Sequence, residues 1–236
     1  MSRRIIHRDT PAGRGRLTAR AGTDCDRAET PPGIRTLSVG TERFGLISVP
    51  PGYRPGRPYP LLVLLHGAGG EAGQAIGWLR PVADEAGLIL LAPQSEGSTW
   101  DVIMGGYGPD VKRIDDALAE VFRRFAIDPD RVAVGGFSDG ASYALSLGLT
   151  NGGLFRRVAA FSPGFAAPAG TDDSPGFYIS HGTGDTVLPI DACSRRLVPR
   201  LRDAGFDVLY REFDGGHTVP PCIAREAVGW LLDDTP

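Results

Sequence analysis

The chain has 236 residues, a formal net charge of -3 and 42% hydrophobic residues. A chain of this length buries enough surface on folding to form one large core without disulfides or metals. Its basic residues are scattered among acidic ones rather than gathered in stripes, which argues against a nucleic-acid or membrane-surface partner.

Cysteine usage and the N-terminal sequence indicate the compartment. Cys25, Cys193 and Cys222 form no C-x-x-C pair, and three cysteines cannot all pair within one chain. Residues 1–20 are basic but lack the apolar core of a secretory signal, and no run approaches 18 apolar residues. These features predict a soluble cytoplasmic protein with no membrane span. They leave the oligomeric state open, with a homodimer as one alternative.

The first 50 residues predict a flexible terminus followed by antiparallel strands. Residues 1–14 are rich in Arg, Gly and Pro and have little to bury, so we expect a flexible segment before a single domain over 15–236. A first edge strand is expected over 16–20. The alternation of apolar residues over 35–50 predicts a hairpin that turns at Gly40 and Thr41.

From residue 60 onward, continuous apolar runs alternate with helical segments. Strands are expected at 61–65, 88–92, 131–135, 158–161, 177–180 and 208–213. Helices are expected at 74–86, 109–125, 141–148, 191–204 and 221–232. This order predicts an α/β fold with a mostly parallel, doubly wound sheet, whose site lies at the carboxyl ends of the strands.

The stretch Gly136-Phe137-Ser138-Asp139-Gly140 joins a buried strand to a helix of small residues. The G-x-S-x-G pattern in this setting is typical of a nucleophile elbow, in which a sharp turn exposes the serine hydroxyl above the sheet. Asp139 is interpreted as a helix-start carboxylate, favoured there by the helix dipole, rather than as a catalytic acid.

A serine nucleophile requires a base, and the chain has four histidines. His7 lies in the expected flexible terminus, and His66 and His181 end strands, where a structural role is the more frequent one. The chain order serine, acid, histidine of such folds leaves His217, which follows the last strand. His217 is therefore the expected base.

Asp185 is the expected acid, because it follows the penultimate strand on a loop between Ser138 and His217. The other aspartates considered lie in a surface loop, at a helix start or too near His217; they are Asp172, Asp173, Asp191 and Asp214. If Asp185 were not the acid, Asp191 or Asp214 would replace it.

The surroundings of the site are less sharply specified. Trp100 lies in a Gly-rich loop on the same side, either as a wall of the substrate pocket or as a loop anchor packed on the core. Leu188, Tyr107 and Met104 are further candidates for the wall. Only about 15 residues separate the strands at 158–161 and 177–180, which leaves no room for a cap domain. An open, shallow site follows.

The segments LLHGAGG, GGFSDGASYAL, SHGTGDTVLPI and GGHTVP together resemble the α/β-hydrolase superfamily, over about residues 43–234. The resemblance is to its phospholipase/carboxylesterase branch, with acyl-protein thioesterases and polyhydroxyalkanoate-depolymerase-like esterases. Thioesterase-like members usually carry Gln after the serine and HGxGD in the first loop, whereas this chain has Asp139 and His66-Gly67-Ala68-Gly69-Gly70. Despite these departures, the resemblance still implies the fold and the triad. It does not imply that the chain acts on the substrates of the thioesterases.

These residues predict a serine hydrolase that cleaves small carboxylic esters through an acyl-enzyme, with no cofactor and no metal. His217 would take the proton of Ser138, Asp185 would orient the imidazole, and the backbone N–H groups of Ala68 and Asp139 would form the oxyanion hole. A thioesterase or peptidase could use the same triad. A non-catalytic binding scaffold is the alternative from another class.

Overall fold

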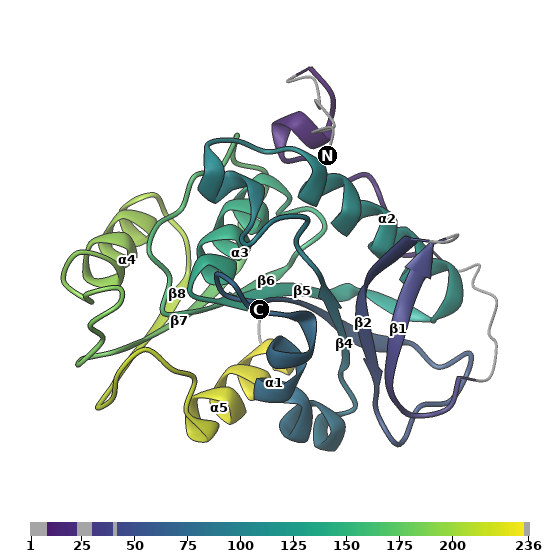
Figure 1. Ribbon diagram of the computed structural model, residues 1–236. Coiled ribbons are helices and arrows are strands. Elements are labelled where there is room, and N and C mark those ends of the chain that lie inside the picture. Colours follow the sequence, from purple (N-terminus) through teal and green to yellow (C-terminus); the bar gives the residue numbers. More distant parts are fainter. Residues whose placement is uncertain (1–8, 23–29, 40–41, 234–236) are drawn as a thin grey trace.

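The computed structural model describes residues 9–22, 30–39 and 42–233. Within them, eight strands form one sheet in the order β1-β2-β4-β3-β5-β6-β7-β8 (Figure 1). The strands are β1 (Gly33–Val39), β2 (Glu42–Val49), β3 (Tyr59–Leu65), β4 (Ile89–Pro93), β5 (Ile127–Phe137), β6 (Arg157–Phe161), β7 (Gly176–Gly182) and β8 (Val208–Phe213). β1 and β2 are antiparallel, β2 pairs antiparallel with β4, and the remaining pairs are parallel.

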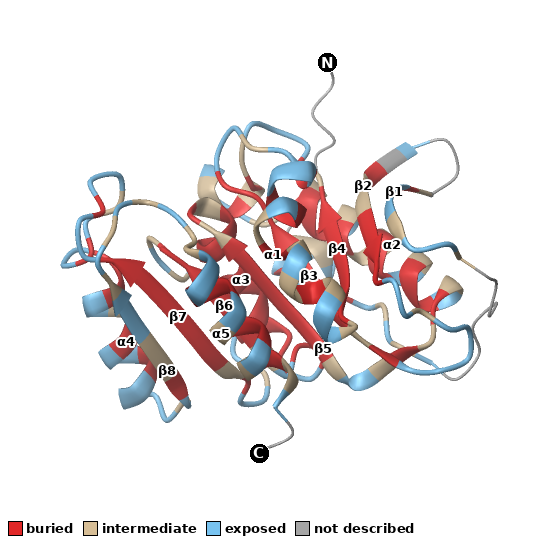
Figure 2. Cartoon of the chain, turned by 90° about the horizontal axis from the view of Figure 1, so that it is seen from below, coloured by how far each residue is buried: buried red, intermediate tan, exposed pale blue. Residues whose placement is uncertain are grey.

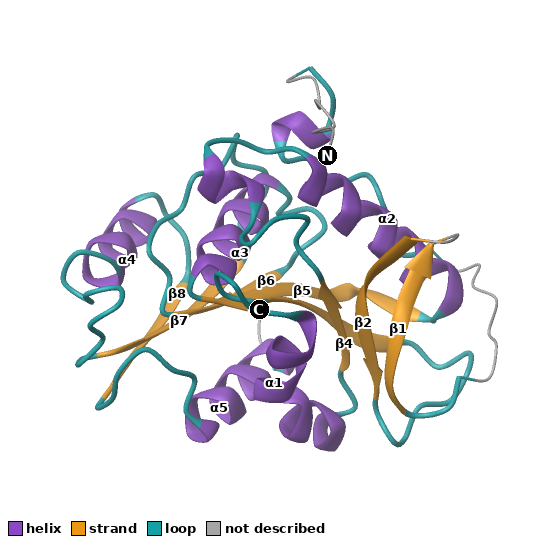
Figure 3. Cartoon of the chain, in the orientation of Figure 1, coloured by secondary structure: helices purple, strands orange, loops and turns teal. Residues whose placement is uncertain are grey.

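Five α-helices cover the two faces of the sheet, as Figure 3 shows. They are α1 (Ala72–Ala86), α2 (Pro109–Arg124), α3 (Asp139–Thr150), α4 (Ser194–Asp203) and α5 (Pro221–Leu232), with short 3-10 turns η1 (Ala12–Arg14) and η2 (Asp101–Met104). Helices α2, α3 and α4 pack on one face and α1 and α5 on the other. This is the expected doubly wound arrangement.

Alternating side chains of the central strands divide the core into two layers. Along β3, Leu61, Val63 and Leu65 pack with α2 and α3, whereas Leu62 and Leu64 pack with α1 and α5. Both faces of such a strand are therefore buried, which is why it reads as a continuous apolar run. Figure 2 shows this burial along the middle of the sheet, with exposed residues on the outer sides of the helices.

The expected strands and helices after residue 59 are confirmed in type and order, and β8 and α5 have the expected bounds. β5 begins at Ile127 rather than 131, since its first residue already pairs with Tyr59. α4 begins at Ser194 rather than 191, because residues 190–193 form separate turns on the Pro189 carbonyl. The expected hairpin is confirmed as β1 and β2; its turn lies outside the described residues.

The edge strand expected over 16–20 is wrong. This segment is extended but pairs with no strand, because side chains take up its backbone N–H groups instead. Leu17 N–H donates to Asn151 Oδ1 at 2.9 Å, and Thr18 and Ala19 N–H donate to Asp115 Oδ1 at 2.7 and 2.8 Å. Most of the terminal segment 1–14 lies outside the described residues, and the domain boundary at 15 stays a prediction.

Residues 162–175, between β6 and β7, contain no helix or strand, so no cap is built there. A row of hydroxyls on α3 holds this segment. Ser142, Ser146 and Thr150 accept backbone N–H groups of Gly164, Ala167 and Ala169 at 2.9, 2.9 and 3.2 Å. The connection is thereby tied along α3 and leaves the carboxyl edge of the sheet uncovered. Among the described residues, none of the helices is long and apolar enough to cross a bilayer.

Candidate active site

Ser138 lies at a sharp turn between β5 and α3. Its backbone has φ 58° and ψ -121°, and its N–H donates to the Phe161 carbonyl at 2.9 Å. The flanking glycines permit close approach: a methyl group on Gly136 would lie 2.4 Å from Gly140 C, and one on Gly140 would lie 2.3 Å from the Leu65 carbonyl oxygen. The elbow therefore packs directly on the end of β3, which larger residues would prevent.

Asp185 and His217 are brought together by the loops after β7 and β8. His217 Nδ1 donates to Asp185 Oδ2 at 2.6 Å, which leaves His217 Nε2 to act as an acceptor. Asp185 Oδ1 accepts the N–H groups of Val187 and Leu188 at 2.9 and 2.8 Å. Burial opposes ionisation, but the bonds from Leu188, His217 and Val187 together hold the pKa of Asp185 below its usual value.

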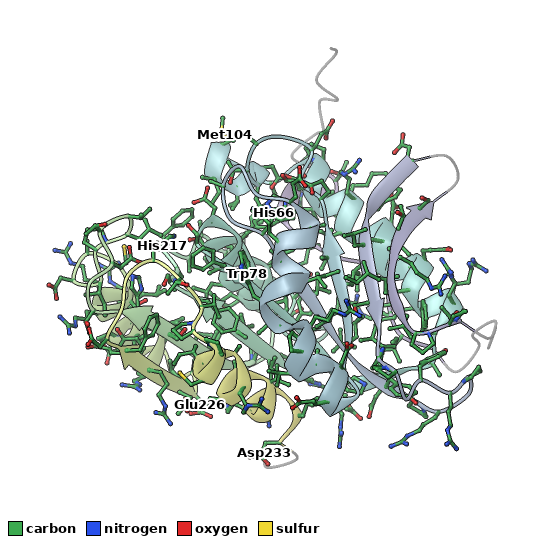
Figure 4. The ribbon with its side chains drawn as sticks, turned by 60° about the horizontal axis from the view of Figure 1, so that its bottom comes forward. His66, Trp78, Met104, His217, Glu226 and Asp233 are labelled. Atoms are coloured by element: carbon green, nitrogen blue, oxygen red, sulfur yellow. The ribbon has the colours of Figure 1, made fainter. Side chains whose placement is uncertain are left out.

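His217 lies beside the elbow. Its ring centroid is 4.5 Å from that of Phe137, the residue before Ser138, and its side chain is 14% exposed. Figure 4 shows His217, His66 and Met104 toward one end of the sheet, with Glu226 and Asp233 toward the other. The imidazole of His217 therefore lies next to the turn that carries Ser138.

The turn after β3 lies against Ser138 on its other side. A methyl group on Gly67 would lie 3.4 Å from Ser138 Cβ. Across residues 9–22, 30–39 and 42–233, no acceptor takes up the backbone N–H of Ala68 or of Asp139. The neighbouring N–H of Gly69 is used, since it donates to the Ser98 carbonyl at 2.6 Å. The two free donors are those proposed for the oxyanion hole.

Sequence reasoning missed Thr99. Its hydroxyl donates to Asp139 Oδ2 at 2.6 Å and thus ties the start of α3 to the loop 94–108. Asp139 accordingly has the position of a helix-start carboxylate rather than that of an acid facing His217. The only local indication in the sequence is that Thr99 lies in the loop after a parallel strand.

Trp100 is fully buried, so it fits the loop-anchor alternative and presents no surface to a substrate. Its Nε1–H donates to the His66 carbonyl at 2.8 Å, and its ring stacks on Tyr143 at 5.3 Å. His66 is buried as well: Nδ1 donates to the Gly67 carbonyl and Nε2 accepts the Ser95 N–H. Burial lowers the pKa of His66, so it is a neutral structural residue of this turn.

The other candidate wall residues have different surroundings. Leu188 is half-buried and lies beside Gly164, where an added methyl group would be 3.5 Å from it. Tyr107 donates from its hydroxyl to the Ala167 carbonyl at 2.8 Å, and Met104 is 72% exposed. Contacts of Leu188 and Met104 with a substrate therefore stay predictions.

The competing acids are engaged elsewhere or exposed. Asp172 pairs with Arg16 at 2.6 Å, Asp191 pairs with Arg195 at 2.9 Å, and Asp214 is exposed. Cys193 is buried, whereas Cys222 is exposed. His7 and Cys25 lie outside the described residues. Within the part of the chain that the structure describes, no three His, Cys, Asp or Glu residues gather as metal ligands would.

Comparison with known proteins agrees with this architecture. A family model for phospholipases and carboxylesterases matches residues 111–222. The structure superposes on the crystal structure of esterase PE8 with a TM-score of 0.66 and 25% identity, over 80% of this chain and 97% of that one. The chain has the α/β-hydrolase fold. A CE1 ferulic acid esterase of Anaeromyces mucronatus has the same fold, with a TM-score of 0.63 at 18% identity over 91% of this chain and 98% of that one.

Curated relatives are esterases as well. Feruloyl esterase C of Emericella nidulans is 28% identical over 168 residues, which are 66% of this chain and 61% of the relative. Acetylxylan esterase of Coprinopsis cinerea is 29% identical over 173 residues, 69% of this chain and 42% of that protein. The chain thus spans about three fifths or less of the length of the curated relatives it matches.

Proposed function

We propose that this α/β-hydrolase is a serine carboxylesterase with Ser138 as nucleophile, His217 as base and Asp185 as acid. One observation carries the proposal: the 2.6 Å bond from His217 Nδ1 to Asp185 Oδ2, beside a serine held at φ 58°. That bond fixes the imidazole tautomer whose Nε2 can accept the proton of Ser138 Oγ.

The reaction has two halves. Ser138 Oγ attacks the ester carbonyl carbon while His217 Nε2 takes the hydroxyl proton, and the oxyanion accepts the N–H groups of Ala68 and Asp139. His217 then gives the proton to the leaving alcohol as the carbon–oxygen bond breaks, which yields the acyl-enzyme. Water, deprotonated by His217, attacks the acyl carbon. The bond from that carbon to Ser138 Oγ then breaks, His217 returns the proton to Oγ, and the carboxylic acid leaves.

The substrate is a small or solvent-protruding ester, because residues 162–175 build no cap over the site. Phe165 and Val187, on the loops after β6 and β7, are 38% and 62% exposed and supply apolar surface at the same edge as Leu188. An aromatic acyl group, such as the feruloyl group in the names of the feruloyl esterase relatives, suits such a surface.

Rates of p-nitrophenyl ester hydrolysis with acyl chains of two to twelve carbons, and of methyl ferulate hydrolysis, test the proposal in wild type and Ser138→Ala. We expect wild-type activity on short chains and a loss of roughly 10³-fold or more in the variant, since the residues of a triad act as a unit. A fluorophosphonate should label wild type and not Ser138→Ala.

Two results would contradict the proposal. Equal labelling of both proteins would place the nucleophile elsewhere, and absence of both labelling and turnover would favour the non-catalytic scaffold. Activity on thioesters or peptides with no activity on oxygen esters would assign the same triad to the alternative acyl bonds.

A further inference from the structure

A second imidazole lies beside the proposed acid. His181, on β7, is fully buried, and its Nε2 is 3.3 Å from Asp185 Oδ2, the same oxygen that accepts from His217. His181 Nε2 is also 2.8 Å from the Leu188 carbonyl, and its Nδ1 is 2.7 Å from Ser194 Oγ. Asp185 thus lies between two histidines, of which the triad uses one.

The contacts fix the tautomer of His181. A carbonyl oxygen only accepts, so Nε2 carries the hydrogen that faces Leu188 and Asp185 Oδ2. Nδ1 then accepts the hydroxyl hydrogen of Ser194 at the start of α4. Desolvation lowers the pKa of His181, and its bond to the Leu188 carbonyl and the nearby Asp185 charge only partly offset this. The residue is therefore a neutral donor aimed at the acid.

Apart from Asp185 and His217, the charged or titratable groups near His181 are paired with one another or neutral. Glu212 on β8 is its partner in the strand register, and Arg195 on α4 holds that carboxylate at 2.6 and 2.8 Å. Burial raises the pKa of Cys193, so the thiol beside Asp185 stays neutral. Asp185 and His217 are the remaining titratable groups that face it.

We propose that His181 is a positioning residue, which holds the Asp185 carboxylate in the orientation in which Oδ2 accepts from His217. Its Nε2–H contacts both the Leu188 carbonyl and Oδ2, and Leu188 N–H and Val187 N–H hold Oδ1. One imidazole therefore fixes the loop and the acid together. The inference rests on the proposed function, because it assigns the orientation of that acid.

Variants at 181 test the proposal against a matched core variant. His181→Leu removes the donor, and His181→Gln keeps an N–H near the position of Nε2. Val198→Ala, one helical turn after Ser194, weakens the packing of α4 without touching Asp185. The readouts are kcat and KM for p-nitrophenyl acetate, the pH profile of kcat/KM, and the downfield proton resonance of the Asp185–His217 bond.

We expect His181→Leu to lower kcat about tenfold with little change in KM, and to change the pH profile of kcat/KM. Without the donor, the Asp185 carboxylate is no longer held toward His217, so the bond from His217 Nδ1 to Oδ2 weakens. The proton resonance should shift in the same variant. His181→Gln should recover most of the rate, and Val198→Ala should leave profile and resonance unchanged.

Equal profiles and resonances in His181→Leu and Val198→Ala would overturn the proposal and leave His181 a core residue. If His181→Leu does not fold, Ser194→Ala decides. It removes the partner of Nδ1 and so lets the ring of His181 turn away from Asp185, so a changed pH profile or resonance supports the proposal and unchanged values overturn it. A wild type without esterase activity would refute the proposed function, whereas the resonance would still report the orientation of Asp185.

Discussion

Ser138 carries the backbone strain of the site. Its backbone, at φ 58° and ψ -121°, has a conformation that residues with a Cβ avoid, at a cost of about 1–3 kcal/mol. The surroundings impose this conformation: the Ser138 N–H donates to Phe161 on β6, and its carbonyl accepts from Ala141 and Ser142 in the first turn of α3. Strand and helix together keep the hydroxyl at the open edge of the sheet.

This strain predicts that Ser138→Gly is more stable than Ser138→Ala by about 1 kcal/mol. Both variants lose the hydroxyl, but only alanine keeps the Cβ, and relief of strain exceeds the extra flexibility that glycine gives the unfolded chain. Urea unfolding of the two inactive proteins measures the difference. Ser146 in the interior of α3 gives the control, since Ser146→Gly should be less stable than Ser146→Ala. The same order at both positions would refute strain at Ser138.

At the scale of elements, the carboxylates of half-buried Asp101 and buried Asp110 close the loop 94–108 onto the start of α2. Asp101 Oδ2 accepts the N–H groups of Gly108 and Asp110 at 2.8 and 2.9 Å. Asp110 in turn accepts from Glu96 N–H at 2.8 Å and from Asp101 N–H at 2.9 Å. Because this loop also carries Ser98 and Thr99, the pair indirectly holds both sides of the proposed oxyanion hole.

The carboxylate pair predicts a pH dependence of stability. Burial and the neighbouring Asp101 raise the pKa of Asp110 to about 6, from 3.8 in the unfolded chain, and Glu96 adds to the rise. A raised pKa means that the folded state binds the proton more tightly. The stabilisation is complete below pH 3.8 and is lost as the pH rises through about 6. Asp110→Asn removes this titration.

We therefore expect the stability of wild type relative to Asp110→Asn to fall by about 1–3 kcal/mol between pH 4 and pH 7. Urea unfolding across this pH range measures the difference in stability. The hydrogen bonds that the variant loses change its stability equally at every pH, so they do not affect the trend. Asp130→Asn, at an exposed position before the buried part of β5, is the control and should show no such trend. A pH-independent difference for Asp110→Asn would refute the raised pKa.

Local sequence patterns predicted the parallel strands. Strands such as Leu61 to Leu65 are buried on both faces, so they form continuous apolar runs. The patterns also placed Ser138, Asp185 and His217 on loops at one edge. They failed for 16–20, where Asp115 and Asn151 replace a strand partner, and they left Trp100 undecided, since burial depends on tertiary packing. The hydroxyls of Ser142, Ser146 and Thr150 recur every four residues, but nothing local identifies the loop they bind.

At the scale of the whole molecule, charge is distributed unequally between the two edges of the sheet. The connections at the carboxyl edge, residues 66–71, 94–108, 162–170, 183–193 and 214–220, contain no lysine or arginine. They contain six acidic residues: Glu71, Glu96, Asp101, Asp185, Asp191 and Asp214. At the opposite edge lie several arginines, namely Arg54, Arg57, Arg131, Arg156 and Arg157. The resulting field favours neutral or cationic substrates over anionic ones at Ser138.

This asymmetry predicts discrimination between two esters that differ in charge, p-nitrophenyl butyrate and the anionic p-nitrophenyl hemisuccinate. We expect the ratio of their kcat/KM values to favour butyrate about tenfold at 10 mM salt and to narrow at 150 mM, where the Debye length falls from about 30 to 8 Å. The two esters also differ in intrinsic reactivity, but this difference contributes equally at both salt concentrations. The change of the ratio with salt therefore reports the electrostatic effect alone.

Two variants locate the effect. Asp214→Asn, in the exposed loop before His217, should narrow the low-salt ratio about twofold, because it removes one negative charge near the mouth. Asp207→Asn, exposed just before β8 at the opposite edge, changes the net charge equally and should leave the ratio unchanged. Equal narrowing in both would indicate that net charge alone acts, and a ratio independent of salt in wild type would show that the loops do not select substrate charge.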